Sequence, residues 1–79
     1  MNENQKNDEE MTFQQASTIA HSPGLEETTS LEKAREKLRN ELFETTNETA
    51  RKIYITLIHY INTELAIREA IVSFGLRNS

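Results

Sequence analysis

The sequence predicts an all-α fold: a small helical hairpin or bundle of three to four short helices that dimerises through its helices. From Leu31 onward, apolar residues recur at three- and four-residue spacing, which is typical of amphipathic helices. The densest apolar run, residues 53–61, is rich in β-branched residues, but no second segment offers it a strand partner. On a helix this run is apolar around more than half of the circumference, which is more than a small monomer covers.

The length and composition favour association with a second copy. The chain has 79 residues and no Cys, so neither a large core nor a disulfide stabilises it. Oligomerisation is the remaining means of stabilisation, and the apolar run supplies a surface for it.

The chain divides into three segments. Residues 1–9 form an acidic leader that we expect to be disordered, because it has no apolar residue after the initial Met. Residues 10–24 hold a short helix, which docks through Phe13 and Ile19, and then a Pro-Gly turn. Residues 25–79 form the helical dimerisation domain.

The first helix of this domain begins with a capping box, in which Thr29 accepts from the backbone and Glu32 reaches back. Four apolar residues mark its inner side: Leu31, Ala34, Leu38 and Leu42. Residues 45–48 then compete with the helix for backbone hydrogen bonds, so we expect the helix to end and a new one to start. One continuous helix stays an alternative, because no Gly or Pro enforces the break.

The next helix spans about residues 48–61. Continued in the same phase, it places Glu64 and Arg68 inside its apolar face, where burying charge is costly. We therefore predict a break near residues 62–63. A last amphipathic helix runs from there to about residue 74, with Gly75 as its C-cap.

The broad apolar face of residues 48–61, extended into the last helix, is the predicted dimer or partner interface. Its members are Ile53, Tyr54, Leu57, Ile58, Ile61 and Leu65. Leu57 lies at its centre, so the interface predicts that Leu57→Ala weakens dimerisation and lowers helicity together.

The side chains needed for catalysis do not form a recognisable pattern. His21 and His59 have no metal-ligand spacing, and Asp8 is the only Asp, in the leader. The two glycines are isolated, so no phosphate-binding loop is present. We expect a protein that is not an enzyme and that takes no metal or cofactor.

The charge distribution weighs against strong nucleic-acid binding. Residues 1–29 hold six acids and one base, whereas residues 30–79 hold seven acids and eight bases. The bases of residues 33–39 alternate with acids, which indicates a solvated, salt-bridged face. Arg51 and Lys52 are possible phosphate contacts at a helix start. With no secretion signal and no membrane span, we expect a cytoplasmic protein.

Part of the sequence resembles the centre of the YmgB/AriR family of small enterobacterial regulators of biofilm formation and acid resistance. The residues that carry the resemblance are Arg51-Lys52-Ile53, Leu57-Ile58-His59 and Glu64, with an acidic pair at Glu26-Glu27 and an end near Leu76-Arg77. The resemblance implies an all-helical homodimer without catalytic activity, which connects signalling proteins to a phosphorelay. The likeness of that family to Hha-type nucleoid modulators implies a secondary link to DNA-bound proteins.

Three functional hypotheses follow. The first is a non-enzymatic helical regulatory protein that acts as a protein–protein connector in stress or biofilm signalling, with itself and an unidentified signalling or regulatory protein as partners. The alternative is a nucleic-acid-associated, Hha-like transcriptional modulator. The third hypothesis is a structural or anti-host protein of a phage or plasmid, because the same small helical fold suits such a protein.

Overall fold

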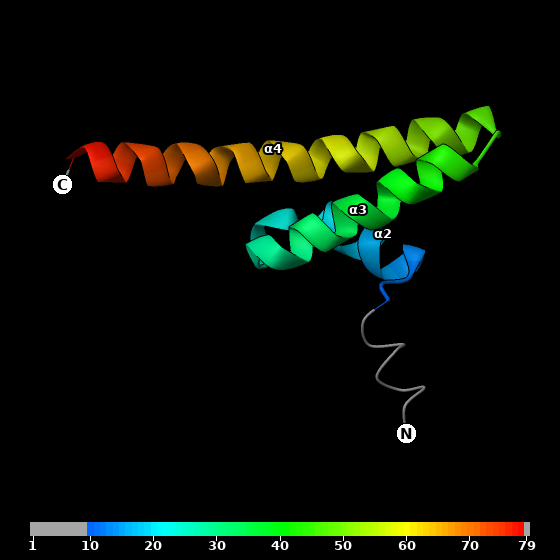
Figure 1. Cartoon of the computed structure of the whole chain (residues 1–79), viewed down its shortest axis with the longest axis horizontal. Coiled ribbons are helices and arrows are strands. Elements are labelled where there is room, and N and C mark those ends of the chain that lie inside the picture. Colours follow the sequence, from blue (N-terminus) through cyan, green and yellow to red (C-terminus); the bar gives the residue numbers. More distant parts are fainter. Residues whose placement is uncertain (1–9, 79) are drawn as a thin grey trace, which may run out of the picture.

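The computed structural model describes residues 10–78 of the chain; the predicted leader, residues 1–9, lies outside them. The helices in this part of the chain are α2 (Phe13–His21), the short 3-10 helix η1 (Pro23–Leu25), α3 (Thr28–Glu44) and α4 (Glu48–Asn78). The predicted all-α class is confirmed. The helices α3 and α4 form a hairpin with α2 packed against both, and the C-terminal part of α4 extends past the start of α3 (Figure 1).

A capping box starts α2. The backbone amide of Gln15 donates to Thr12 Oγ1 at 3.1 Å, and the Thr12 amide donates to Gln15 Oε1 at 2.9 Å. The helix is buried through two small residues, Ala16 and Ala20, which allow a close approach to its neighbours. It therefore belongs to the core, whereas Phe13, predicted to dock it, is 37% exposed and meets the Tyr54 ring edge-on at 5.5 Å.

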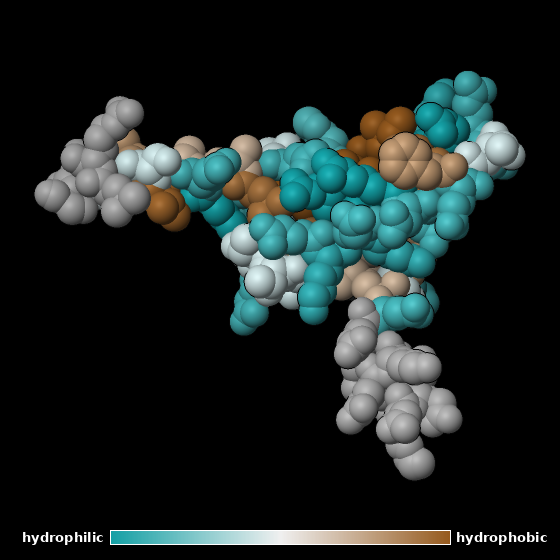
Figure 2. All heavy atoms as spheres, in the orientation of Figure 1, coloured by the Kyte–Doolittle hydropathy of each residue, from teal (hydrophilic) through white to brown (hydrophobic). Residues whose placement is uncertain are grey.

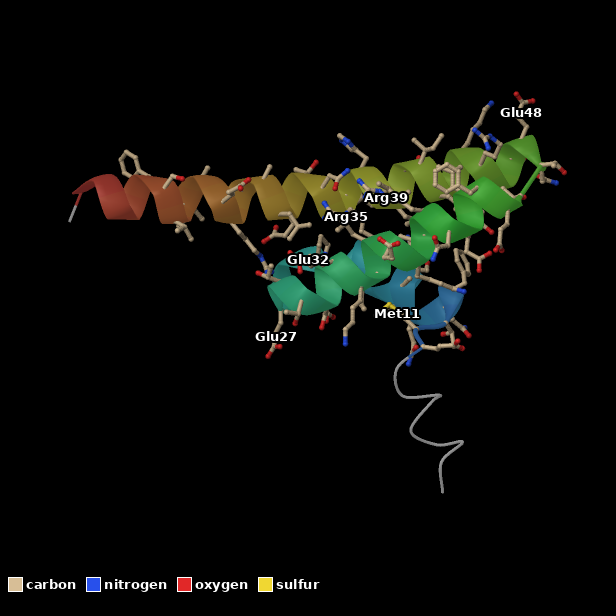
Figure 3. All side chains as sticks on the ribbon, in the orientation of Figure 1. Met11, Glu27, Glu32, Arg35, Arg39 and Glu48 are labelled. Carbon is tan, nitrogen blue, oxygen red and sulfur yellow. The ribbon has the colours of Figure 1, made fainter. Side chains whose placement is uncertain are left out.

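The predicted inner side of α3 is confirmed, because Leu31, Ala34 and Leu38 are buried. Its predicted start is wrong: the N-cap is Glu27, with no side-chain cap hydrogen bond, and the Thr29–Glu32 capping box does not form. The reason lies outside α3, because Arg68 of α4 donates hydrogen bonds to the Pro23 and Glu26 carbonyls and so holds the segment that precedes α3. Arg35 of α3 reaches toward α4 and donates to Asn62 Oδ1 at 2.8 Å (Figure 3).

The predicted end and restart of the helix near residues 45–48 is confirmed. The side-chain oxygen of Asn47 accepts from the Ala50 amide at 2.9 Å and caps α4. The Asn47 amide in turn donates to Thr45 Oγ1 at 3.2 Å. Short polar side chains therefore make this turn without Gly or Pro.

The predicted break near residues 62–63 is wrong, because α4 is one continuous helix of 31 residues. The prediction assumed that Glu64 and Arg68 have no partners inside the apolar face. In the structure they pair with each other at 2.8 Å, so the helix keeps its phase through them. Gly75 is not a C-cap either; it lies within α4.

The core is thin. The buried apolar residues of the described chain are Ala16, Ala20, Leu31, Ala34, Leu38, Leu57 and Ile61. Three of them are alanines, so the apolar volume that one copy buries is small for three packed helices. In residues 10–78, no helix has the length and apolar character needed to cross a bilayer.

Candidate interaction surface

The structure divides the predicted interface into an inner and an outer part. Leu57 is 3% exposed and Ile61 is fully buried, both against α2 and α3 of the same chain. Tyr54, Ile58 and Leu65 are partly buried and pack on that core. Of the six, only Ile53 has about half of its surface exposed, at 49%. The face centred on Leu57 is therefore mostly the inner face of the hairpin, where α2 and α3 cover it.

A second apolar row on α4 is exposed. Its members, which we call the ridge, lie seven residues apart and are 49%, 44%, 48% and 67% exposed in the order Ile53, Tyr60, Ile67 and Phe74. Ile71 lies beside this row and is 64% exposed. In Figure 2, apolar atoms are spread along α4 into its C-terminal part, whereas the surface over α3 is mostly hydrophilic. Half-exposed large apolar side chains at regular spacing are typical of a binding surface.

Small residues alternate with the ridge. This small row consists of Thr49, Thr56, Thr63 and Ala70, all exposed. Together the two rows repeat at alternating spacings of four and three residues, which is the a/d pattern of a coiled coil. The Thr56 hydroxyl donates to the Lys52 carbonyl at 2.9 Å, so it needs no other partner if the row is covered.

Two grooves run beside the ridge where α2 crosses α4. One has a volume of about 320 Å³, and Ser17 and His21 of α2 face Thr49 and Ile53 across it. The other, of about 510 Å³, lies between Pro23 and the stretch 59–64 of α4. Tyr60 lines both grooves and separates them. The N-terminal half of the ridge is therefore bordered by hollows, and the C-terminal part of α4 extends past the start of α3 (Figure 1).

Arg68 fixes the position of that extension. Besides its ion pair with Glu64, it donates through Nη1 to Thr28 Oγ1 and through Nη2 to the Pro23 carbonyl, both at 3.1 Å. A further hydrogen bond from Nη2 reaches the Glu26 carbonyl. One guanidinium thereby joins η1, the start of α3 and α4. The positive charge of Arg68, which the sequence pattern placed in the apolar face, is therefore paired and hydrogen-bonded there.

The two residues predicted as nucleic-acid contacts differ in their surroundings. Arg51 donates from Nη1 to the Leu42 carbonyl at 3.3 Å and so helps to close the turn between α3 and α4. Lys52 is exposed and lines the smaller groove. A structural role thus accounts for Arg51, and the nucleic-acid hypothesis stays a prediction.

His21 and Lys37 make contacts within or close to their own helices. His21 Nδ1 lies 2.7 Å from the Ser17 carbonyl, and its ring is edge-on to Tyr60 at 6.4 Å. On α3, the hydrogen bond from Lys37 to Glu41 raises the pKa of the Lys37 ammonium. Within residues 10–78, no group of three or more His, Cys, Asp or Glu is placed to hold a metal ion.

Sequence reasoning missed most of the ridge, although its signal is in the sequence. Tyr60, Ile67 and Phe74 follow Ile53 at intervals of seven, but the predicted break at residues 62–63 divided the repeat between two helices. Once α4 is continuous, the four residues share one side. No protein-family model, curated protein or solved structure matches the chain.

Proposed function

We propose that this protein is a non-enzymatic helical regulatory protein that works as a protein–protein connector. The ridge of α4 is the observation that supports the proposal. It presents four large apolar side chains in one row on a helix that α2, η1 and Arg68 hold in place. A rigid helix with an apolar row suits recognition of another helix, because the row inserts between the side chains of its partner.

The first partner in this proposal is a second copy of the chain. The thin core favours this choice, because dimerisation adds buried apolar surface that a single copy lacks. Burying a large apolar side chain completely is worth about 1.5–3 kcal/mol, and the ridge residues are about half exposed, so each contributes about 1 kcal/mol. The eight ridge side chains of two copies together contribute about 8 kcal/mol, which is of the same order as the entropic cost of association, so the dimer should be weak and should exchange readily. A connector that exchanges partners requires such an affinity.

The cellular setting of the proposal is the cytoplasm, in stress or biofilm signalling. It rests on the resemblance of about residues 26–77 to the YmgB/AriR family. The second partner is a signalling or regulatory protein, reached through surface that the dimer leaves free.

Sedimentation velocity with two matched variants tests the proposal. Ile67→Glu places a charge on the ridge, and Ile55→Glu makes the same change at a residue of similar exposure, 48% against 51%. The two positions lie about 120° apart around α4. We expect the wild type and Ile55→Glu to dimerise as their concentration rises, and Ile67→Glu to stay monomeric.

Circular dichroism on both variants is the control for folding, because both side chains are half exposed and neither should lower the helix content. A wild type that stays monomeric at every concentration would contradict self-association. Equal effects of the two substitutions would show that the ridge is not the binding surface.

A further inference from the structure

The alternation of large and small side chains on the exposed side of α4 indicates how two copies would pack. The ridge holds only large side chains and the small row holds only Thr or Ala, along four successive heptads. Two helices with such a repeat pack as a left-handed pair, in which the side chains of one enter spaces between those of the other. The arrangement that fills these spaces evenly depends on the relative direction of the helices.

In a parallel pair, equivalent positions lie level with each other. Tyr60 then meets Tyr60 and Phe74 meets Phe74, whereas the intervening layers hold only Thr or Ala. Layers of two large side chains alternate with layers of two small ones, which leaves gaps between the helices. In an antiparallel pair, each ridge position lies level with a small-row position of the other helix, so every layer holds one large and one small side chain.

We propose that two copies of this chain associate through antiparallel α4 helices, with the two-fold axis passing between Ile61 and Asn62. The inference rests on the proposed function, and it adds the direction and register of the dimer. In this register every ridge residue faces a small-row residue: Ile53 faces the partner's Ala70, Tyr60 the partner's Thr63, Ile67 the partner's Thr56, and Phe74 the partner's Thr49. A shift by one heptad toward the C-terminus places Thr49 and Ile53 outside the paired rows, and a shift in the opposite direction places Ala70 and Phe74 outside them, so the pairing is complete in one register.

The shape of the monomer agrees with this direction. The antiparallel arrangement brings the extension of α4 from one copy alongside the N-terminal half of α4 in the other. That half is bordered by the groove between Ser17, His21 and Thr49. The partner's Phe74 and the partner's Ile67 arrive at the levels of Thr49 and Thr56, at this groove. In a parallel pair the two extensions instead meet each other, and the two N-terminal halves, each bordered by its own α2, lie side by side.

The charges at the edge of the seam are compatible with the same register. Lys52 and His59 lie just outside the ridge on one edge of α4. In the antiparallel pair they come opposite the partner's Ser73 and the partner's Ala66, so no like charges meet along this edge. The hydroxyl of Thr56 is already bonded within its own helix, so covering it leaves no unpaired donor.

Disulfide cross-linking tests direction and register, because the natural chain has no Cys. Ile53→Cys and Ala70→Cys are prepared as separate proteins and oxidised alone and as an equimolar mixture. Both positions are exposed, so both variants should fold, which circular dichroism checks. We expect a covalent dimer in the mixture and little in either protein alone.

Two further mixtures control for position. Tyr60→Cys with Ala70→Cys reports the register shifted by seven residues, which displaces the pair by about 10 Å along the helix, beyond the reach of a disulfide. Ile55→Cys with Ala70→Cys reports a different side of α4. Neither mixture should give the covalent dimer.

Efficient cross-linking of Ile53→Cys alone would overturn the antiparallel direction, and a product from the Tyr60→Cys mixture would overturn the register. Absence of every product, in a protein that sedimentation shows to be dimeric, would place the seam elsewhere and leave the proposed function standing. A wild type that sediments as a monomer would instead contradict the self-association on which the inference rests.

Discussion

The guanidinium of Arg68 lies 2.8 Å from the carboxylate of Glu64, one turn earlier on α4. The pair is partly buried, and Arg68 directs its remaining donors across to η1 and the start of α3. An ion pair that shares its hydrogen bonds with backbone carbonyls is satisfied where it lies, so it does not require the helix to break. The same contact is compatible with a continuous α4 and joins α4 to η1 and to the start of α3.

Removal of the Arg68 side chain should destabilise the fold. Arg68→Ala deletes the ion pair and three hydrogen bonds that join separate elements, and we expect the free energy of unfolding to fall by about 1–3 kcal/mol. Urea unfolding followed by circular dichroism measures the change. Lys37→Ala is the control: it removes a pair with Glu41 that lies within one helix and joins no separate elements, so it should cost less than about 0.5 kcal/mol. Equal losses would show that Arg68 does not join these elements in solution.

Truncation of Leu57 should lower the stability of the single chain. Leu57 is 3% exposed within one copy, so Leu57→Ala leaves a cavity and costs about 2–5 kcal/mol. The loss should appear even at protein concentrations where no dimer forms, in thermal or urea unfolding. Ile55→Ala, at a position that is 51% exposed, should change little by comparison. A Leu57→Ala effect that vanished on dilution would return Leu57 to the dimer seam.

The contribution of the Asn47 cap to the stability of the fold should be measurable with a single substitution. Asn47→Ala removes the side-chain oxygen that accepts from the Ala50 amide, and loss of such a cap costs about 0.5–2 kcal/mol. Thr46→Ala changes the neighbouring exposed residue and is the matched control. Thermal unfolding should show a lower midpoint for Asn47→Ala only. Similar midpoints for the two variants would mean that the cap contributes nothing measurable.

Binding to DNA is the outcome predicted by the alternative hypothesis, and we expect it to be absent. The chain carries a net charge of −4, and Arg51 donates to the Leu42 carbonyl within the turn. Gel shift with duplex DNA at micromolar protein and low salt should therefore show no complex. A complex that disappears as salt rises, and that Lys52→Ala weakens, would support the nucleic-acid role instead.

Local sequence patterns were sufficient for part of the fold. The spacing of Leu31, Ala34 and Leu38 predicted the inner side of α3, because helical periodicity alone decides which residues share a face. The polar residues before Glu48 predicted the turn into α4, because their side chains compete with the helix for backbone hydrogen bonds over a few residues. Both signals lie within one or two helical turns of the chain.

The candidate surface was predicted less well, because which residues of α4 are buried depends on contacts with segments that are distant in the sequence. The apolar face around Leu57 was predicted as a dimer or partner interface, but the sequence does not say whether α2, α3 or a partner covers it. Ala16 and Ala20 give almost no hydrophobic signal, yet they allow α2 to cover part of that face. The sequence therefore did not show that the chain itself covers Leu57 and Ile61, or that the ridge is the apolar row of α4 that stays exposed.

The sequence by itself determined the helical class, the turn at residues 45–47 and the seven-residue repeat of large side chains from Ile53 to Phe74, because these depend on local spacing. Only the tertiary structure decided that the repeat lies on one uninterrupted, exposed side of α4. In that structure Arg68, which the pattern placed in the apolar face, is satisfied by carbonyls more than forty residues earlier in the chain. Every residue offers a carbonyl, so no sequence pattern marks the ones that a distant arginine will reach.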